Sequence, residues 1–480
     1  MNLKRPIFAI FLFACSVTWA QNRQLLYDFT DIPQALLLNP GMETSFDWFA
    51  GIPMLSGVHA QAGTSGISVN DIFADDGLDI NDKVRNRAVF GLGAGDNQSV
   101  SSQIEIFSGG FRGKNRPQNF YSFGIYGELD FINYWPKDLA ILAYEGNASR
   151  LGQRFDLSHL KTRGEMLSVF HFGINRQWNR ELTVGARAKI YSSILNFTST
   201  KNDGYFLTRQ GQNNLLANVL AANMRLRTSG LGALEDAADG EANDIASTIL
   251  SRGLLGGDLG LGFDLGFTYH LNAQTVITGS LLDLGFIYHN SDVQNYSLEG
   301  RAVNEGVEII LPNALVDPTA DFWQELVDEI EALVPFEEND SSYISFRPTK
   351  LYGSVKYSWG MPKGKGPIDC DCDITGSDRS QRNQYLNSLG GQLFMVNRPR
   401  GPQAALTAFY ERRFGNILAL RSTYTVDKFS LTNFGLGLSL YAGPVNFYIM
   451  ADNLLAYQNL AAARTASLQF GLNIISWGDN

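Results

Sequence analysis

The stretch LGLGFDLGFTYHL, residues 259–271, limits the fold of this chain more than any other part of the sequence. Its odd-numbered residues are large and apolar, and between them stand glycines, Asp264, Thr268 and His270. A period of two places these two sets on opposite faces of a β-strand. One face is therefore apolar, and the other is small and polar. The same alternation recurs in residues 121–131, 166–175, 182–191 and 466–474.

The length of these strands favours a membrane over a soluble sandwich. Strands of soluble proteins usually have about 5–6 residues, whereas several runs here have about 10–13, enough to cross a bilayer when tilted. Aromatic residues near the ends of the runs are typical of the girdles at membrane–water boundaries, although the aromatic edge of a soluble core is an alternative. These aromatic residues are Tyr269, Tyr288, Trp359, Tyr441 and Trp477.

Lipid also determines how such a sheet must end. An open edge in hydrocarbon would leave backbone N–H and C=O groups unpaired, at several kcal/mol each, so the sheet has to close. The sequence therefore predicts an all-β fold, a closed antiparallel transmembrane β-barrel of about 14 strands with helical and loop insertions. In this barrel the odd-numbered residues of 259–271 face lipid, and the even-numbered ones face the interior.

The N-terminus reads as an export signal. MNLKRPIFAIFLFACSVTWAQN has a basic start, an apolar stretch and a small residue, Ala20. This predicts a signal peptide over residues 1–20, with a lipoprotein acylated at Cys15 as the alternative. Residues 21–480 are then a single barrel domain located in the outer membrane.

Three insertions interrupt the strand pattern, near residues 205–257, 290–342 and 360–384. The first contains NNLLANVLAANMRL and EANDIASTILSRGL, each predicted as a short helix. The second contains an acidic helix around Phe322–Val334, with its apolar residues on one side. The third is polar without periodicity and predicts a loop.

Composition and motifs exclude several classes of function. The net charge is −10, and no cluster of Lys and Arg is dense enough for a nucleic-acid partner. The sequence lacks G-x-S-x-G, H-E-x-x-H and a Walker lysine motif. We therefore expect no catalytic activity and no cofactor.

Four charged or titratable residues are predicted to face the lumen: Asp264, His270, Arg187 and Lys189. A role in ligand binding or gating is one interpretation. Structural pairing within a polar barrel interior is the other.

No metal site is predicted, although two stretches were candidates. Cys370 and Cys372 alternate with aspartates, which allows a metal site, a strained disulfide or an ordinary loop. The acidic run from Asp75 to Asp82 departs from the EF-hand template and favours a polar loop. Gly91–Gly95 lacks the strand and helix that a phosphate loop needs.

Four short segments carry a resemblance to a known family. They are Asn39-Pro40-Gly41, LLDLGFI at residues 281–287, FRPTKLYGSVKYSW from Phe346, and YIMADNLL from Tyr448. With the barrel pattern, they resemble an outer-membrane barrel family common in Bacteroidota, described only as a domain of unknown function and distantly similar to the long-chain fatty acid transport porins. In those porins an Asn-Pro-Ala segment belongs to an N-terminal hatch that plugs the barrel. Here Gly41 replaces the alanine.

The resemblance implies a passive transport barrel for small hydrophobic molecules. The alternative is a non-catalytic accessory component of a Bacteroidota secretion or motility machine, with the 290–342 insertion contacting a protein partner. The expected partners are thus outer-membrane lipid, a small hydrophobic ligand and, in the alternative, another protein.

Overall fold

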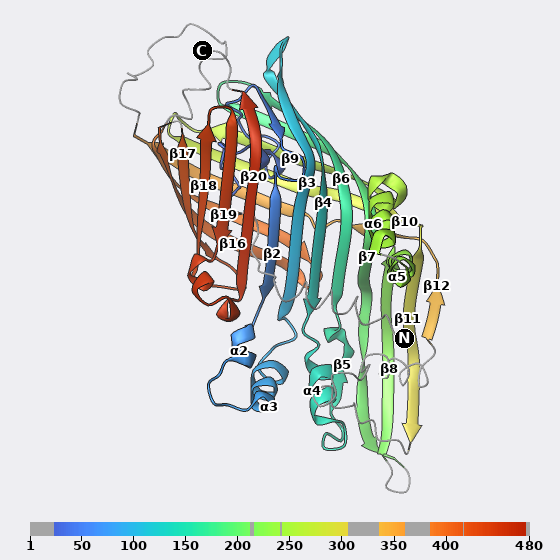
Figure 1. Cartoon of the computed structure of the whole chain (residues 1–480). Helices are drawn as coiled ribbons and strands as arrows, with labels where there is room; N and C mark the ends of the chain where they lie inside the picture. The colour runs from blue at the N-terminus through green and yellow to red at the C-terminus, as the bar shows by residue number, and fades with distance from the viewer. Residues whose placement is uncertain are drawn as a thin grey trace.

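The computed structural model describes residues 24–211, 216–240, 242–305, 336–360, 385–415 and 417–476. Their strands form a closed antiparallel barrel with 14 strand positions (Figure 1). The predicted fold class and approximate strand number are confirmed. Among the described residues, no helix has the length and apolar character needed to cross a bilayer.

The wall follows the order of the chain, with two positions each shared by two short strands. β1 and β2 together occupy the first position, and β13 and β14 occupy another, because β10 pairs with both. In order around the wall the strands are β1 (Trp48–Gly51) with β2 (Val58–Thr64), β3 (Asn97–Gly113), β4 (Arg116–Tyr134), β6 (Thr162–Gln177), β7 (Leu182–Gln210), β9 (Asp258–His270), β10 (Thr275–His289), β13 (Tyr343–Phe346) with β14 (Lys350–Trp359), β15 (Asn387–Arg398), β16 (Gly401–Phe414), β17 (Leu418–Val426), β18 (Asn433–Ala442), β19 (Val445–Asp452) and β20 (Thr465–Ser476).

The last strand closes the barrel against the first. β20 pairs with β1 from Trp48↔Ser476 to Gly51↔Asn473, and it pairs with β2 farther along. Among the described strands, no edge of the wall is therefore left open.

The two faces of β9 divide as the alternation predicts. Leu261 is 59% exposed and Phe263 42% exposed, whereas Asp264 between Phe263 and Leu265 is 0% exposed. The other outward residues of this strand, from Leu259 to Tyr269, are also exposed. β9 thus carries apolar side chains outside and polar or small residues inside.

A sheet extends beyond one end of the barrel. β7 has 29 residues; its first half pairs with β9 and its second half with β8 (Leu216–Ser229). β8 pairs in turn with β11 (Val293–Glu305), which pairs with β12 (Phe336–Asn339), and β5 (Arg154–Asp156) pairs with β7. Figure 1 shows β7, β8 and β11 continuing past the barrel.

The predicted helix in NNLLANVLAANMRL is wrong, because the described part of this segment belongs to β8. Both edges of β8 are hydrogen-bonded, and Leu220 and Ala222 join an apolar cluster. This tertiary pairing outweighs the helix propensity of its Leu and Ala residues. The helix predicted in EANDIASTILSRGL is confirmed as α6 (Ala242–Ser251), which follows α5 (Leu231–Asp239) and leads into the π-helix η5 (Arg252–Gly256).

Short helices gather at the same end as the extended sheet. They are α2 (Val69–Phe73), α3 (Ile80–Lys83), η2 (Val84–Val89), α4 (Lys137–Glu145), η3 (Leu157–His159), η6 (Leu454–Gln458) and η7 (Leu460–Ala462). Ile141 and Leu142 of α4 pack with Phe155, Phe206 and Leu220 into a compact apolar cluster. We call the extended sheet together with the helices that pack in this cluster the cap.

The acidic run before η2 contributes to helix capping and ion pairs. Asp79 accepts a hydrogen bond from the backbone N–H of Asn81 (2.8 Å) at the start of α3. Asp76 pairs with Lys83 and with Arg87 (3.4 Å).

Some predictions concern residues that lie outside the described ranges. They are the signal peptide at 1–20, the helix around Phe322–Val334, the loop with Cys370 and Cys372, and Trp477. Of the described girdle candidates, Tyr269 and Tyr288 are 36% and 46% exposed. Tyr441 is wrong as a girdle residue, because it is buried and its hydroxyl donates to the carbonyl oxygen of Asp31 inside the barrel.

Candidate functional site: a plugged lumen and its charged layer

The N-terminal segment, residues 24–46, lies inside the barrel, and we call it the plug. It contains the 3₁₀-helix η1 (Pro33–Leu37), which starts with a proline that needs no hydrogen-bond partner for its nitrogen. Its apolar side chains pack against apolar residues of the wall in one buried cluster. The rings of Tyr27 and Tyr352, for example, stack with centroids 4.7 Å apart. The lumen at this level is filled by protein.

Glycines of the wall let the plug approach at the Asn39-Pro40-Gly41 turn. Gly185 and Gly266 are cross-strand partners on β7 and β9. A Cβ atom on Gly266 would lie 2.1 Å from Oδ1 of Asn39, and one on Gly185 would lie 2.0 Å from the carbonyl oxygen of Pro40. Position 41 also requires glycine for this close approach, because a Cβ there would lie 2.3 Å from the carbonyl oxygen of Gly266.

Hydrogen bonds hold the turn on this glycine surface. Asn39 donates from Nδ2 to the carbonyl oxygen of Phe267 (3.2 Å), and the hydroxyl of Thr268 donates to the carbonyl oxygen of Gly41 (2.8 Å). Nδ2 of Asn175 on β6 donates to the carbonyl oxygen of Pro40 (2.9 Å). Strands β6 and β9 thus bind the turn, and β7 between them contacts it at Gly185.

Each carboxylate of the plug faces a basic side chain of the wall. The pairs are Asp28 with Lys356 (3.2 Å), Asp31 with Arg413 (2.9 Å) and Glu43 with His270 (2.8 Å). Residues 24–46 contain no Lys, Arg or His. The plug is therefore an acidic segment attached to basic positions of the wall. His270, one of the predicted lumen residues, belongs to this attachment.

The other three predicted lumen residues meet in one buried cluster. Asp264 pairs with Arg187 (3.3 Å) and with Lys189 (2.8 Å), and the side chains of all three are at most 3% exposed. Arg187 also donates from Nη1 to the carbonyl oxygen of Leu37 (3.1 Å), which ties this cluster to the plug. A ligand-binding role for these residues stays a prediction.

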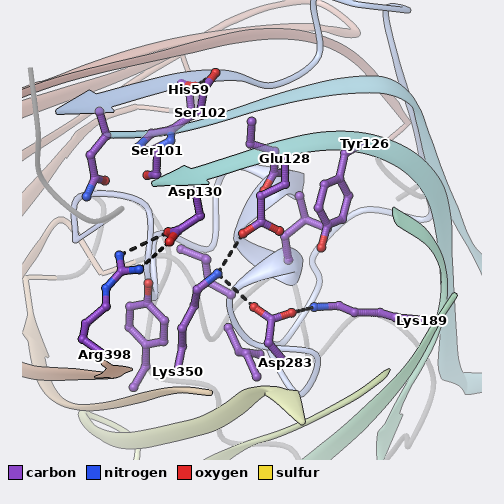
Figure 2. A pocket seen from close by; sticks show the side chains of 16 residues that line it. His59, Ser101, Ser102, Tyr126, Glu128, Asp130, Lys189, Asp283, Lys350 and Arg398 are labelled. Atoms are coloured by element: carbon purple, nitrogen blue, oxygen red, sulfur yellow. Dashed lines mark hydrogen bonds and ion pairs between the residues drawn. The ribbon is translucent and has the colours of Figure 1, made fainter. Parts of the chain in front are cut away.

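The cluster continues across the lumen as a layer of alternating charges. Lys189 pairs with Asp283 (2.6 Å), Asp283 with Lys350 (2.9 Å), and Lys350 with Glu128 (3.1 Å). Arg347 then contacts Glu128 (2.9 Å), so the layer joins β4, β7, β9, β10 and the β13–β14 segment. Figure 2 shows Lys350 between Glu128 and Asp283. Buried charges are costly unless paired, and this layer satisfies them mutually.

Sequence reasoning missed Asp283, Glu128, Arg347 and Lys350. Asp283 has a positive φ of 59° at the point where the register between β9 and β10 shifts. The irregularity brings its carboxylate between Lys189 and Lys350 inside the barrel. Two of the resemblance segments, LLDLGFI and FRPTK, therefore meet in this layer. The sequence signal that could have identified Asp283 was a carboxylate inside the apolar run 281–287.

A cavity of about 50 Å³ lies between the plug and the charged layer. Leu37 and Leu38 of the plug form one side. Its polar lining includes His59, Gln61, Ser101, Ser102, Gln103, Glu128, Asp130, Lys189, Asp283, Lys350 and Arg398 (Figure 2). The space holds a few water molecules at roughly 10–15 Å³ each. With the plug in this position, the barrel has no room here for a larger solute.

Comparisons with known proteins give one family and several solved barrels. A model of the family described as "Family of unknown function (DUF5723)" matches residues 40–452. The Ralstonia pickettii toluene transporter TbuX is 10% identical with a TM-score of 0.40, covering 93% of this chain and 94% of its own. A Pseudomonas aeruginosa FadL homologue is 10% identical with a TM-score of 0.40, covering 94% and 95%. The P. putida toluene transporter TodX is 9% identical with a TM-score of 0.35, covering 94% and 92%. No curated protein matches the sequence.

Proposed function

Because the chain belongs to the family of unknown function DUF5723, whose description assigns no activity, we propose a function from its own structure. The protein is an outer-membrane barrel that passes small hydrophobic molecules when its plug is displaced. It works as a passive channel.

The exterior of the barrel supports a location in a membrane. Outward side chains of consecutive strands are large and apolar, for example Leu265, Phe286, Leu393 and Ile449, each 40% exposed or more. Soluble monomers rarely leave such a continuous apolar surface in water. A closed barrel with this belt fits an outer membrane.

The turns support one orientation in that membrane. In such barrels the periplasmic turns are short and the extracellular loops long. One end of this barrel has the short connections 114–115, 178–181, 271–274 and 443–444, together with the longer connection 360–386. The other end has the long connections 65–96 and 135–161 and the cap, together with the short connection 399–400. The cap is therefore extracellular in this proposal, and the Asn39-Pro40-Gly41 turn lies toward the periplasmic end.

The apolar inner wall is the observation that supports hydrophobic molecules as the substrate class. Water-filled barrels have polar interiors, yet a large part of this wall facing the plug is apolar. Its larger side chains are Phe120, Tyr352, Phe394, Val396, Tyr448 and Met450. If the plug withdrew, these side chains would line the passage, which favours hydrophobic solutes over ions.

A reversible lock on the plug tests this proposal. Oδ2 of Asp28 on the plug lies 3.0 Å from the hydroxyl oxygen of Ser354 on β14, so cysteines at both positions can be joined by an oxidant or a short bismaleimide. Cys370 and Cys372 are first replaced by serine. We expect proteoliposomes with the reduced double variant to take up monoaromatic hydrocarbons or medium-chain fatty acids, and cross-linking to stop that uptake.

The control places both cysteines on the wall, at Ser358 and Ser388, whose hydroxyl oxygens are 2.9 Å apart. This cross-link leaves the plug free and should leave uptake unchanged. Uptake at the level of empty liposomes by the uncross-linked protein would contradict the proposal.

The cap supports a second candidate, the non-catalytic accessory role. Its sheet of β8, β11 and β12 extends beyond the wall (Figure 1) and is not needed to close the barrel. Isolation in mild detergent distinguishes the two functions. A stable large complex that dissociates when the cap is altered favours the accessory role, and a lone barrel with uptake favours the channel.

A further inference from the structure

Asp258, His289 and Ser345 form a linear hydrogen-bonded set next to the junction between barrel and cap. Nδ1 of His289 lies 2.9 Å from Oδ2 of Asp258, and its Nε2 lies 2.8 Å from the hydroxyl oxygen of Ser345. The three residues come from the start of β9, the end of β10 and the short strand β13. The pairing of β10 with β9 on one side and with β13 on the other brings them together.

The chemistry of the two partners determines which atom donates in each hydrogen bond. An ionised carboxylate only accepts, so Nδ1 of His289 carries the hydrogen that is donated to Asp258. In the neutral ring Nε2 is then an acceptor, and the hydroxyl of Ser345 donates to it. This is the tautomer in which histidine can remove the proton of a serine.

The surrounding structure fixes the carboxylate and the ring. Oδ1 of Asp258 accepts hydrogen bonds from the backbone N–H groups of Asn290 (3.0 Å) and Ser291 (2.8 Å). The ring of His289 stacks on Tyr343 with centroids 4.5 Å apart. The side chains of Asp258 and His289 are fully buried, whereas Ser345 is half-buried. The outermost member of the set is thus the nucleophile.

We propose that Ser345 is a reactive serine that attacks acyl esters, with His289 as its general base and Asp258 as the residue that orients the histidine. This hydrolytic activity goes beyond the channel function and does not depend on it. Ile344 and Phe346 on either side point outward, 51% and 72% exposed, so Ser345 faces the interior. A substrate would therefore reach Ser345 from the cap end of the lumen.

The proposed reaction balances with water alone. Oγ of Ser345 bonds to the ester carbonyl carbon while Nε2 of His289 takes the hydroxyl proton. The carbon–oxygen bond to the alcohol breaks, and His289 returns the proton to the leaving alkoxide. Water then hydrolyses the acyl-serine by the same route, which releases a carboxylic acid and restores Ser345. Arg163 donates to the carbonyl oxygen of Phe346, next to Ser345 in the chain (2.6 Å), and in this proposal its guanidinium stabilises the negative charge on the substrate oxygen.

A fluorophosphonate probe tests the serine directly. The full-length protein in detergent is incubated with the probe, and the modified residue is identified by peptide mass spectrometry. We expect labelling at Ser345, its loss in Ser345→Ala, and a fall of about 100-fold or more in labelling rate in Asp258→Asn, where the ring loses its orienting carboxylate. Hydrolysis of p-nitrophenyl butyrate should fall in parallel.

The matched control is Ser388→Ala, which removes a buried interior serine whose partner is another hydroxyl, that of Ser358. It should label at the wild-type rate. Heat-modifiable gel mobility confirms that each variant is folded. If folded wild-type protein is not labelled at Ser345, or is labelled equally in Asp258→Asn, the proposal is overturned and the set only fixes three strands. Uptake through the lumen is measured separately and does not enter this result.

Discussion

At the scale of single residues, glycine determines how closely the plug approaches the wall. The turn at Asn39-Pro40-Gly41 contacts the backbone of β7 and β9 at two glycines, Gly185 and Gly266. The alternation in the sequence predicted that even-numbered residues of 259–271 face inward, and the glycines left space there. It could not predict what fills that space, because Asn39 and Phe267, which share a hydrogen bond, are 228 positions apart.

Substituting Gly266 with alanine should therefore loosen the plug while the barrel stays closed. The new Cβ would meet Oδ1 of Asn39 at 2.1 Å and displace the turn, at a cost of about 1–3 kcal/mol, as for overpacking elsewhere. A cysteine placed in the plug should react faster with a water-soluble maleimide in this variant. Gly391→Ala on β15 is the control, because its Cβ would meet nothing within 4 Å. Equal reactivity in the two variants would contradict this account.

Asp264 is the central acid between Arg187 and Lys189. Asp264→Asn removes its charge and leaves two buried cations with fewer partners, so we expect a loss of about 3–5 kcal/mol of stability. The temperature at which the folded gel band disappears should fall accordingly. Asp75→Asn, at an exposed site, should leave it unchanged. An unchanged temperature for Asp264→Asn would show that the layer tolerates the loss of this charge.

At the scale of elements, long strands connect the barrel to the cap. β7 pairs with β9 inside the barrel and with β8 beyond it, so a single strand belongs to both parts. Periodicity predicted the strands whose residues alternate strictly between the exterior and the interior of the barrel. It failed for β8, whose Leu and Ala residues suit a helix and whose strand structure depends on hydrogen bonds to β7 and β11. Sites where strands pair irregularly, such as Asp283, were also missed, because their position depends on the pairing of neighbouring strands and not on periodicity.

Acid should loosen the helices of the cap. Glu145 at the end of α4 pairs with Arg150 and with Arg85 (2.8 Å). Hydrogen bonds from Arg150 and then Arg85 hold the pKa of Glu145 below its usual range. A carboxyl group with a depressed pKa stabilises the folded state above its unfolded pKa of about 4.3 and loses that contribution as the pH falls through the folded value.

The expected effect is below about 1 kcal/mol, because solvent screens this pair. Hydrogen exchange in residues 137–145 should therefore rise modestly below about pH 4, relative to the wall strands. Glu145→Gln should remove this pH dependence. If exchange in this variant still rises below that pH, another group is responsible.

At the scale of the whole molecule, the plug separates the two ends of the barrel. Composition, strand length and the need to close a sheet in lipid predicted the fold class and approximate strand number. They could not predict the ion pairs that attach the plug, such as Asp28 with Lys356, whose hydrogen bond spans 328 positions of the chain. Such pairs depend on closure, which sequence periodicity does not describe.

Deleting residues 24–46 should convert the plugged barrel into an open channel. Removing the plug vacates the space beside the apolar inner wall and removes the acidic partners that the plug supplies to Lys356, Arg413 and His270. Planar bilayer recordings should show a large increase in conductance over the intact protein. Heat-modifiable mobility is the control for a folded barrel. A folded deletion variant that conducts no more than the intact protein would place the barrier elsewhere, in the charged layer.

The pairing of Trp48 with Ser476 has a consequence for biogenesis. The first segment to emerge from the ribosome after residue 23 is the one that ends enclosed, and the final strand completes its enclosure. Contacts of such long sequence separation form slowly. The nascent protein must therefore keep its leading segment unburied until the trailing strand arrives, and a truncated chain that lacks β20 would expose that segment to proteases.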